Sequence, residues 1–170
     1  MKTSKELSNK PLISITDGRK LGEIKDLYLD KDMRQVTAVF LGKEGLINQK
    51  ARMIERSAVQ VYGVDVWLVS GSDKVMKQDD VRESASFILV GELRGREIQT
   101  DGGSKLGIVD DVILDDEARV LGFSLGKVYV QGPLAERKTI AREAVTHLGS
   151  KKEPMTIILA QAESLALPTA

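Results

Sequence analysis

Residues 105–127 have the sequence KLGIVDDVILDDEARVLGFSLGK. This stretch resembles an earlier one, residues 20–43, with the sequence KLGEIKDLYLDKDMRQVTAVFLGK. The match continues further along the chain, where IERSAV at residues 54–59 aligns with IAREAV at residues 140–145. The period is about 85 residues, whereas solenoid repeats have periods of about 20–50 residues. The sequence therefore predicts two similar domains in tandem.

Each copy has the pattern of several short strands separated by polar turns. In the first copy, Asp17-Gly18 predicts a tight hairpin turn, because Asp-Gly readily adopts the positive φ values that such a turn needs. The expected strands of this copy are residues 11–15, 22–29, 35–41, 51–54, 60–62 and 65–69. Strands this short bury their apolar faces most economically in a small barrel. The sequence thus predicts an all-β fold of two small barrels, each with about six short strands and little helix.

The boundaries of the domains follow from the repeat and from composition. We expect a first barrel at residues 1–72 and a second at residues 87–164. Residues 73–86, DKVMKQDDVRESAS, are polar and charged, so we interpret them as a linker. Residues 165–170 are expected to form a flexible tail.

Composition excludes several classes of protein. Lys plus Arg equal Asp plus Glu at 25 each, so no net charge draws the chain to nucleic acid or to an anionic membrane. The chain has no cysteine, which excludes disulfides, thiolate nucleophiles and cysteine-based metal sites. No segment approaches the ~20 apolar residues of a membrane-spanning helix, and the first residues lack the apolar run of a signal peptide. We therefore expect a soluble, cytoplasmic protein.

The repeated motif resembles a known family. DGRKLGEIKDLYLD and DGGSKLGIVDDVILD, each followed by Ile-x-Arg-x-Ala-Val, resemble the PRC-barrel family. This family includes the cytoplasmic part of the photosynthetic reaction centre H subunit and the C-terminal half of a bacterial 16S rRNA maturation factor. The resemblance implies a small β-barrel that serves as a docking or assembly module, with no catalytic residue and no cofactor.

Two aspartates recur at equivalent positions, each four residues after a recurring glycine. They are Asp26 after Gly22 and Asp111 after Gly107. The alternation of apolar and polar residues is interrupted near both aspartates. This favours a β-bulge, in which the carboxylate accepts hydrogen bonds from the backbone N–H groups that the bulge leaves unpaired. We interpret all four residues, with Asp17 and Gly18, as structural; a hydrolase that uses the two aspartates is the last-ranked alternative.

The remaining candidates for chemistry are weak. The acidic runs at residues 110–111 and 115–117 lack the alternating ligands and central glycine of the best-known calcium loop, so no metal site is predicted. His147 is the only histidine, and we interpret it as an ordinary strand residue. No catalytic residue, metal or cofactor is therefore predicted, and the protein is not expected to be an enzyme.

The two copies differ most in one connection, residues 44–50 in the first and 128–138 in the second. Loops on a fixed scaffold commonly carry binding. The apolar residues of these loops are candidate partner contacts, with capping of the barrel end as the alternative: Leu46, Ile47, Val130, Pro133 and Leu134.

The expected function is that of a docking or scaffold protein, in which two linked barrels bind a protein partner or a membrane-associated complex. An RNA-binding accessory factor in ribosome assembly is the alternative. Its candidate contacts are the basic residues that recur near these loops, which are Lys50, Arg52, Arg56, Arg137, Lys138 and Arg142. Aromatic side chains that would stack on bases are missing between them.

Overall fold

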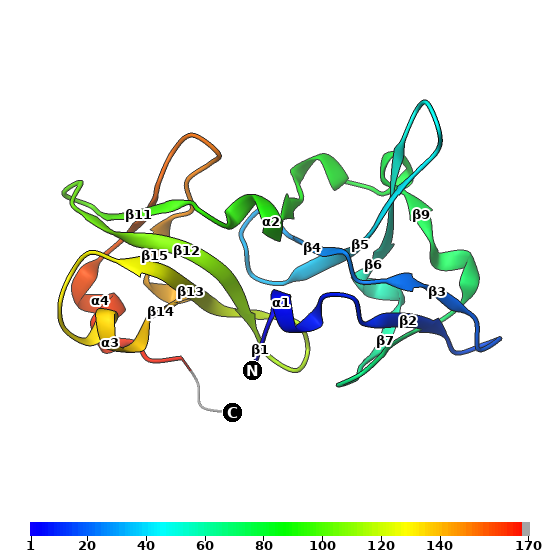
Figure 1. Cartoon of the computed structure of the whole chain (residues 1–170), viewed down its shortest axis with the longest axis horizontal. Helices are drawn as coiled ribbons and strands as arrows, with labels where there is room; N and C mark the ends of the chain where they lie inside the picture. The colour runs from blue at the N-terminus through cyan, green and yellow to red at the C-terminus, as the bar shows by residue number, and fades with distance from the viewer. Residues whose placement is uncertain (168–170) are drawn as a thin grey trace.

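The computed structural model describes residues 1–167 and consists mostly of β-strands, arranged in two units that follow the sequence repeat (Figure 1). We call residues 1–86 the first unit and residues 87–167 the second unit. The first unit contains β1 (Lys2–Thr3), α1 (Ser4–Leu7), β2 (Pro11–Ser14), β3 (Lys20–Glu23), β4 (Asp26–Leu29), β5 (Val36–Glu44), β6 (Lys50–Glu55), η1 (Arg56–Ala58), β7 (Val59–Tyr62), β8 (Trp67–Val69), η2 (Ser72–Lys74), β9 (Met76–Lys77), η3 (Gln78–Asp80) and η4 (Ser84–Ser86). The second contains β10 (Ile88–Leu89), α2 (Val90–Leu93), β11 (Glu97–Thr100), β12 (Lys105–Leu114), β13 (Val120–Val128), α3 (Pro133–Arg137), β14 (Thr139–Ala141), η5 (Arg142–Ala144), β15 (Val145–His147), β16 (Met155–Ile157) and α4 (Leu159–Ser164).

The strands form three sheets, and the expected all-β fold is confirmed. In the second unit one sheet runs in the order β14-β13-β12-β11-β16-β15. In the first unit the equivalent strands are divided between two sheets, β4-β5-β6-β9, to which β10 of the second unit adds at β4, and β3-β2-β8-β7. The division arises because β12 is one long strand, whereas its counterpart is interrupted between β3 and β4.

The two units exchange their first strand and helix. β1 of the first unit pairs antiparallel with the end of β12, where Lys2 lies opposite Leu114. β10 of the second unit pairs in the same way with β4, where Ile88 lies opposite Leu29. Since Leu29 and Leu114 are equivalent positions of the repeat, the two pairings have the same register. The units are therefore related by an approximate twofold axis and each completes the other.

A short backbone bridge lies between the β4–β5 and β12–β13 turns. Gln35 and Arg119, which are equivalent positions, form an isolated antiparallel bridge. Around it, the N–H of Val36 donates to the carbonyl of Ala118 at 2.9 Å, and the N–H of Val120 donates to the carbonyl of Arg34 at 2.8 Å. The main chains of the two units are thus hydrogen-bonded to each other at the approximate twofold axis.

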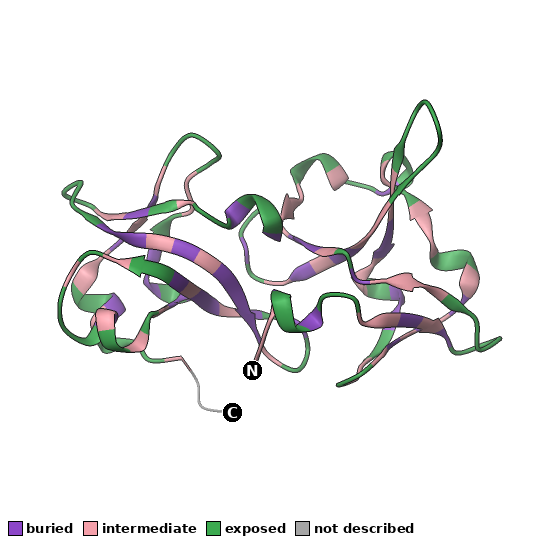
Figure 2. Ribbon diagram, viewed as in Figure 1, coloured by how far each residue is buried: buried purple, intermediate pink, exposed green. Residues whose placement is uncertain are grey.

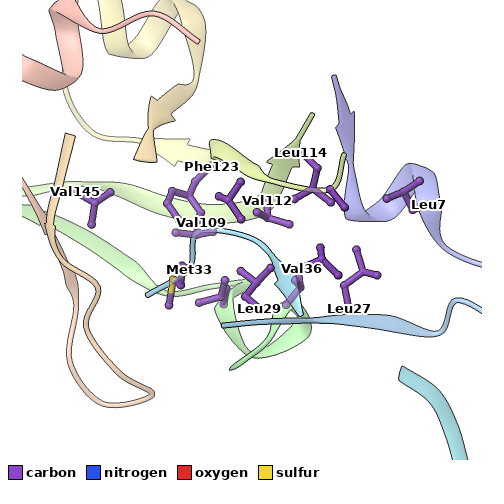
Figure 3. Close-up of a cluster of buried hydrophobic side chains, with 14 of the residues drawn as sticks. Leu7, Leu27, Leu29, Met33, Val36, Val109, Val112, Leu114, Phe123 and Val145 are labelled. Atoms are coloured by element: carbon purple, nitrogen blue, oxygen red, sulfur yellow. The ribbon is translucent and has the colours of Figure 1, made fainter. Parts of the chain in front are cut away.

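Apolar side chains of both units form one continuous core. Figure 3 shows residues of the first unit in contact range of residues of the second, and their burial is nearly complete. The labelled members are Leu7, Leu27, Leu29, Met33, Val36, Val109, Val112, Leu114, Phe123 and Val145. Removal of either unit would expose the apolar side chains of the other that face the junction.

The segment expected as a linker is ordered against the first unit. β9, within residues 73–86, pairs antiparallel with β6. Val81 is 4 % exposed and belongs to a small cluster with Tyr28, Ala38 and Met53. The segment therefore extends the sheet of the first unit. The expected tail at residues 165–170 lies partly outside the described residues.

Cleavage of the chain tests whether the junction holds the units without a covalent link. A protease site inserted between Glu83 and Ser86, where Arg82, Glu83 and Ala85 are exposed, should give two fragments after cutting. We expect the fragments to co-elute at the position of the intact chain in size-exclusion chromatography, because the exchanged elements and the shared core remain. Separation of the fragments in native buffer would contradict the shared core.

Candidate functional site

The two apolar loops singled out by the sequence have opposite environments. In the first unit, β5 and β6 continue outward as a hairpin whose tip projects from the body of the molecule (Figure 1). At this tip, Leu46 is 101 % exposed and Ile47 is 92 % exposed. Figure 2 shows the whole tip as exposed. We call residues 44–50 the hairpin tip.

In the second unit the equivalent loop folds back over the core. It forms α3, which begins with Pro133 after Gly132, whose φ is +98°. Leu134 is 0 % exposed and belongs to the shared core, and Val130 is half-buried against it. The prediction that Leu134 contacts a partner is wrong, because its side chain is inaccessible. Pro133 remains exposed at the start of α3.

The last helix of the chain covers this end of the second unit. The Nη2 atom of Arg137 donates to the carbonyls of Ala162 at 2.9 Å and Glu163 at 2.6 Å, both in α4. Ala162 is fully buried in the same core. The first unit continues from β8 into η2 and β9 instead, and β9 pairs with β6 at the base of the hairpin. The hairpin tip therefore stays uncovered.

A groove of about 560 Å³ lies at the base of the hairpin. Its lining includes the cationic residues Lys50, Arg52 and Lys77. The Nζ of Lys50 lies 2.8 Å from Oδ2 of Asp79, and this hydrogen bond raises the pKa of Lys50. The Nε of Arg52 lies 3.3 Å from Oε2 of Glu44. The groove is thus lined by three cations and by the carboxylate of Glu44, and two of the cations, Lys50 and Arg52, are in ion pairs.

The recurring aspartates lie at the junction between the units. Asp111 is 1 % exposed, and its carboxylate accepts hydrogen bonds from the Ser4 hydroxyl, from the Lys5 N–H at 2.9 Å and from the Val112 N–H at 2.8 Å. The pairing of β12 with β13 shifts register on both sides of Val109, next to Asp111. Asp111 therefore fixes the start of α1, a helix of the other unit.

Asp26 makes the reciprocal contact. Its Oδ2 accepts from the Gly91 N–H of α2 at 2.9 Å, and its Oδ1 accepts from the Leu27 N–H at 2.8 Å. Burial raises the pKa of Asp26, and these two hydrogen bonds oppose that shift. Both carboxylates are thus engaged in holding a helix of the neighbouring unit.

The recurring turn residues lie where chain reversal or close packing needs them. Asp17 accepts a hydrogen bond from the Arg19 N–H at 3.1 Å, and Gly18 has φ of +69°. Gly22 lies 3.4 Å, measured from an ideal Cβ, from Cδ2 of Leu41. At Gly107 a Cβ would meet the carbonyl oxygen of Lys127, so only glycine allows β12 and β13 to approach there.

Two recurring arginines join the units in a way that the sequence analysis missed. Arg56 donates from Nη1 to the carbonyl of Ala118 at 3.2 Å and from Nη2 to that of Glu117 at 2.6 Å. Its equivalent, Arg142, is 7 % exposed and donates from Nε and Nη2 to the carbonyl of Asp32 at 3.1 and 2.7 Å. Their recurrence was the available signal, but it was interpreted as a basic surface. Both guanidinium groups are engaged with carbonyls of the other unit.

The described residues contain little that supports a catalytic or metal centre. Within residues 1–167, no group of three or more acidic or histidine side chains is arranged to hold a metal ion. His147 lies exposed on β15. Among the same residues, no helix is long and apolar enough to cross a membrane.

The fold defines a class of small β-rich module, present here as two interlocked copies. The family model described as PRC-barrel domain matches residues 1–76 and 86–140. The chain belongs to the PRC-barrel family, which is generally non-catalytic and often interacts with other proteins and complexes. A search of curated proteins finds no match.

The opposite environments of Leu134 and Leu46 give a direct comparison. We expect Leu134→Ala to lower the free energy of unfolding by about 2–5 kcal/mol, because it leaves a cavity in the shared core. Leu46→Ala should change it by less than about 0.5 kcal/mol, because this side chain contacts only solvent. Urea denaturation of the two variants measures both values, and equal losses of stability would contradict the assigned environments.

The raised pKa of Asp26 predicts a pH dependence. Between the unfolded-state pKa and the higher folded-state pKa of Asp26, the folded protein binds more protons at this site. The stability of the wild type relative to Asp26→Asn should therefore rise as the pH falls through the folded-state pKa. Denaturation of both proteins from neutral pH to about pH 4 measures the difference, in which other titrating groups cancel. A difference that stays constant or falls on acidification would contradict the assignment.

Proposed function

We propose that this protein is a non-catalytic docking module that binds its partner through the hairpin tip. The observation that carries the proposal is the pair of neighbouring aliphatic residues, Leu46 and Ile47, almost fully exposed on a projecting hairpin. Exposed aliphatic side chains cost solvation free energy that binding would recover. The contact is to a protein partner or to a membrane-associated complex.

The shared core gives this contact a rigid base. The sequence led us to expect two barrels whose weak contacts act together through a short linker. The units instead share one core, and the equivalent apolar loop of the second unit is folded over that core. We therefore propose a single contact surface on the first unit, with the second unit as its structural support.

The proposed location is the cytoplasm, where a chain without cysteine loses nothing to the reducing conditions. RNA binding in ribosome assembly stays the alternative outcome of the experiment below. The structure gives it less support than the sequence did, because Arg56 and Arg142 donate to backbone carbonyls across the junction.

Recovery of partners from a host lysate, with membranes removed by detergent and ultracentrifugation, tests the proposal. We expect the variant Leu46→Asp/Ile47→Asp to lose its partner while its unfolding midpoint stays unchanged, because both side chains are exposed. The matched control is Ile15→Asp/Val64→Asp, which places the same charge at two aliphatic residues that are 53 % and 67 % exposed. Capture that is equal for both double variants would contradict docking through the hairpin tip, and capture that nuclease abolishes would point to RNA.

A further inference from the structure

The hairpin places an apolar tip directly above a positive groove. Leu46 and Ile47 are the exposed aliphatic residues of the hairpin tip, and the charged residues that line the groove beside them are Glu44, Lys50, Arg52 and Lys77. The polar side chains of Asn48 and Ser72 line the same groove. The same surface of the hairpin therefore has apolar side chains in its turn. Beside them, the groove has side chains that could donate hydrogen bonds to an anion.

Two cations in this groove face each other without a shared counter-ion. Arg52 and Lys77 are direct cross-strand partners on β6 and β9. Like charges directly opposite one another on antiparallel strands are destabilising. Glu44 pairs with Arg52, and Asp79, which pairs with Lys50, also attracts Lys77, although among residues 1–167 Lys77 has no ion pair within 4.0 Å, so the repulsion between Arg52 and Lys77 is only partly compensated. An anionic group bound between them would remove this repulsion.

The tip by itself is large enough to insert into a lipid surface, whereas a protein partner would also have to contact residues beyond it. A stable protein interface buries about 800 Å² on each partner, which is far more than two aliphatic side chains on a narrow turn provide. A bilayer needs no complementary cleft, since acyl chains deform around an inserted side chain. Small apolar surfaces next to basic residues bind membranes by combining burial with attraction to anionic lipids.

The spacing along the hairpin also suits a bilayer. Leu46 and Ile47 lie in the turn between the paired residues Glu44 and Lys50, and Arg52 lies two residues further along β6, which corresponds to roughly 7 Å of extended strand. Interfacial peptides bury their apolar faces about 5–10 Å into the boundary between headgroups and acyl chains. With the tip at that depth, the groove lies at the level of the phosphates.

We propose that the hairpin docks the protein onto an anionic bilayer, with Leu46 and Ile47 among the acyl chains and a lipid phosphate in the groove between Arg52 and Lys77. The inference rests on the proposed docking function and names the surface that the hairpin contacts.

Vesicle co-sedimentation with the purified full-length chain tests this inference. We expect binding to vesicles of phosphatidylcholine with phosphatidylglycerol, and little binding to phosphatidylcholine alone. Leu46→Asp/Ile47→Asp should reduce binding to the anionic vesicles about tenfold or more, because it removes the inserted side chains. The control Ile15→Asp/Val64→Asp has the same net charge and should bind like the wild type apart from a small electrostatic effect.

A second pair of variants tests the groove. Lys77→Glu should weaken binding about fivefold or more, because it reverses one of the two facing charges. Lys127→Glu makes the same change of net charge at an exposed position of β13 in the other unit, and should have a much smaller effect. Raising the salt from about 0.1 M to about 1 M should weaken binding of the wild type, because the groove is screened.

Three outcomes would overturn the inference. One is equal binding to both kinds of vesicle, and another is anionic-vesicle binding that neither the tip nor the Lys77 variant changes. The third is binding that survives Leu46→Asp/Ile47→Asp but is displaced by inorganic phosphate, which would assign the groove to free phosphate.

The two experiments distinguish failure of the lipid inference from failure of protein docking. If the wild type fails to bind vesicles while hairpin-dependent capture of a protein persists, only the lipid inference fails. If vesicle binding depends on the hairpin but no partner is captured, only protein docking fails.

Discussion

The carboxylate of Asp111 is 1 % exposed and binds Ser4 and Lys5, which lie more than one hundred residues earlier in the chain. A buried carboxylate needs several hydrogen-bond donors, because the charged group loses its hydration. Here two of those donors, Ser4 and Lys5, come from the start of α1, and Val112 and Arg94 supply the others, so the first helix of one unit becomes part of the other unit. The same exchange occurs at Asp26 with α2, and the arrangement therefore cannot form within one unit alone.

This exchange explains the position of the other residues at the junction. Because α1 and α2 lie across the approximate twofold axis, the turns near Gln35 and Arg119 meet and form the central bridge. Arg56 and Arg142 then reach carbonyls of the opposite turns, Arg56 those of Glu117 and Ala118 and Arg142 that of Asp32. Polar contacts frame the junction, and the shared apolar core fills it. The two units consequently form one packed body, from which the hairpin tip projects (Figure 1).

The sequence was sufficient for the local structure and insufficient for the contacts between the units. The register of the repeat predicted the turns at Asp17-Gly18 and the equivalence of Asp26 with Asp111, since these depend on neighbouring residues. It did not show that each aspartate binds a helix of the other copy, because a pattern repeated twice is equally compatible with contacts inside a copy and between copies. The same limit applies to the apolar loops. Leu134 and Leu46 look alike in sequence, and the burial of Leu134 depends on α3 and α4, which are joined by hydrogen bonds between residues 25 and 26 positions apart.

The approximate symmetry also separates the positions that must match from those that are free to differ. At the junction, residues of each unit contact the other unit, so equivalent residues of the two copies make equivalent contacts. The hairpin tip and α3 lie at opposite ends of the molecule (Figure 1), where no contact between the units constrains them. There the two copies have diverged most: one loop is closed by a helix and an arginine, and the other presents two aliphatic residues above three cations. A surface that departs from the symmetry without a structural need is a candidate for function, and the hairpin of the first unit is such a surface, which is the physical basis of the docking role proposed for it.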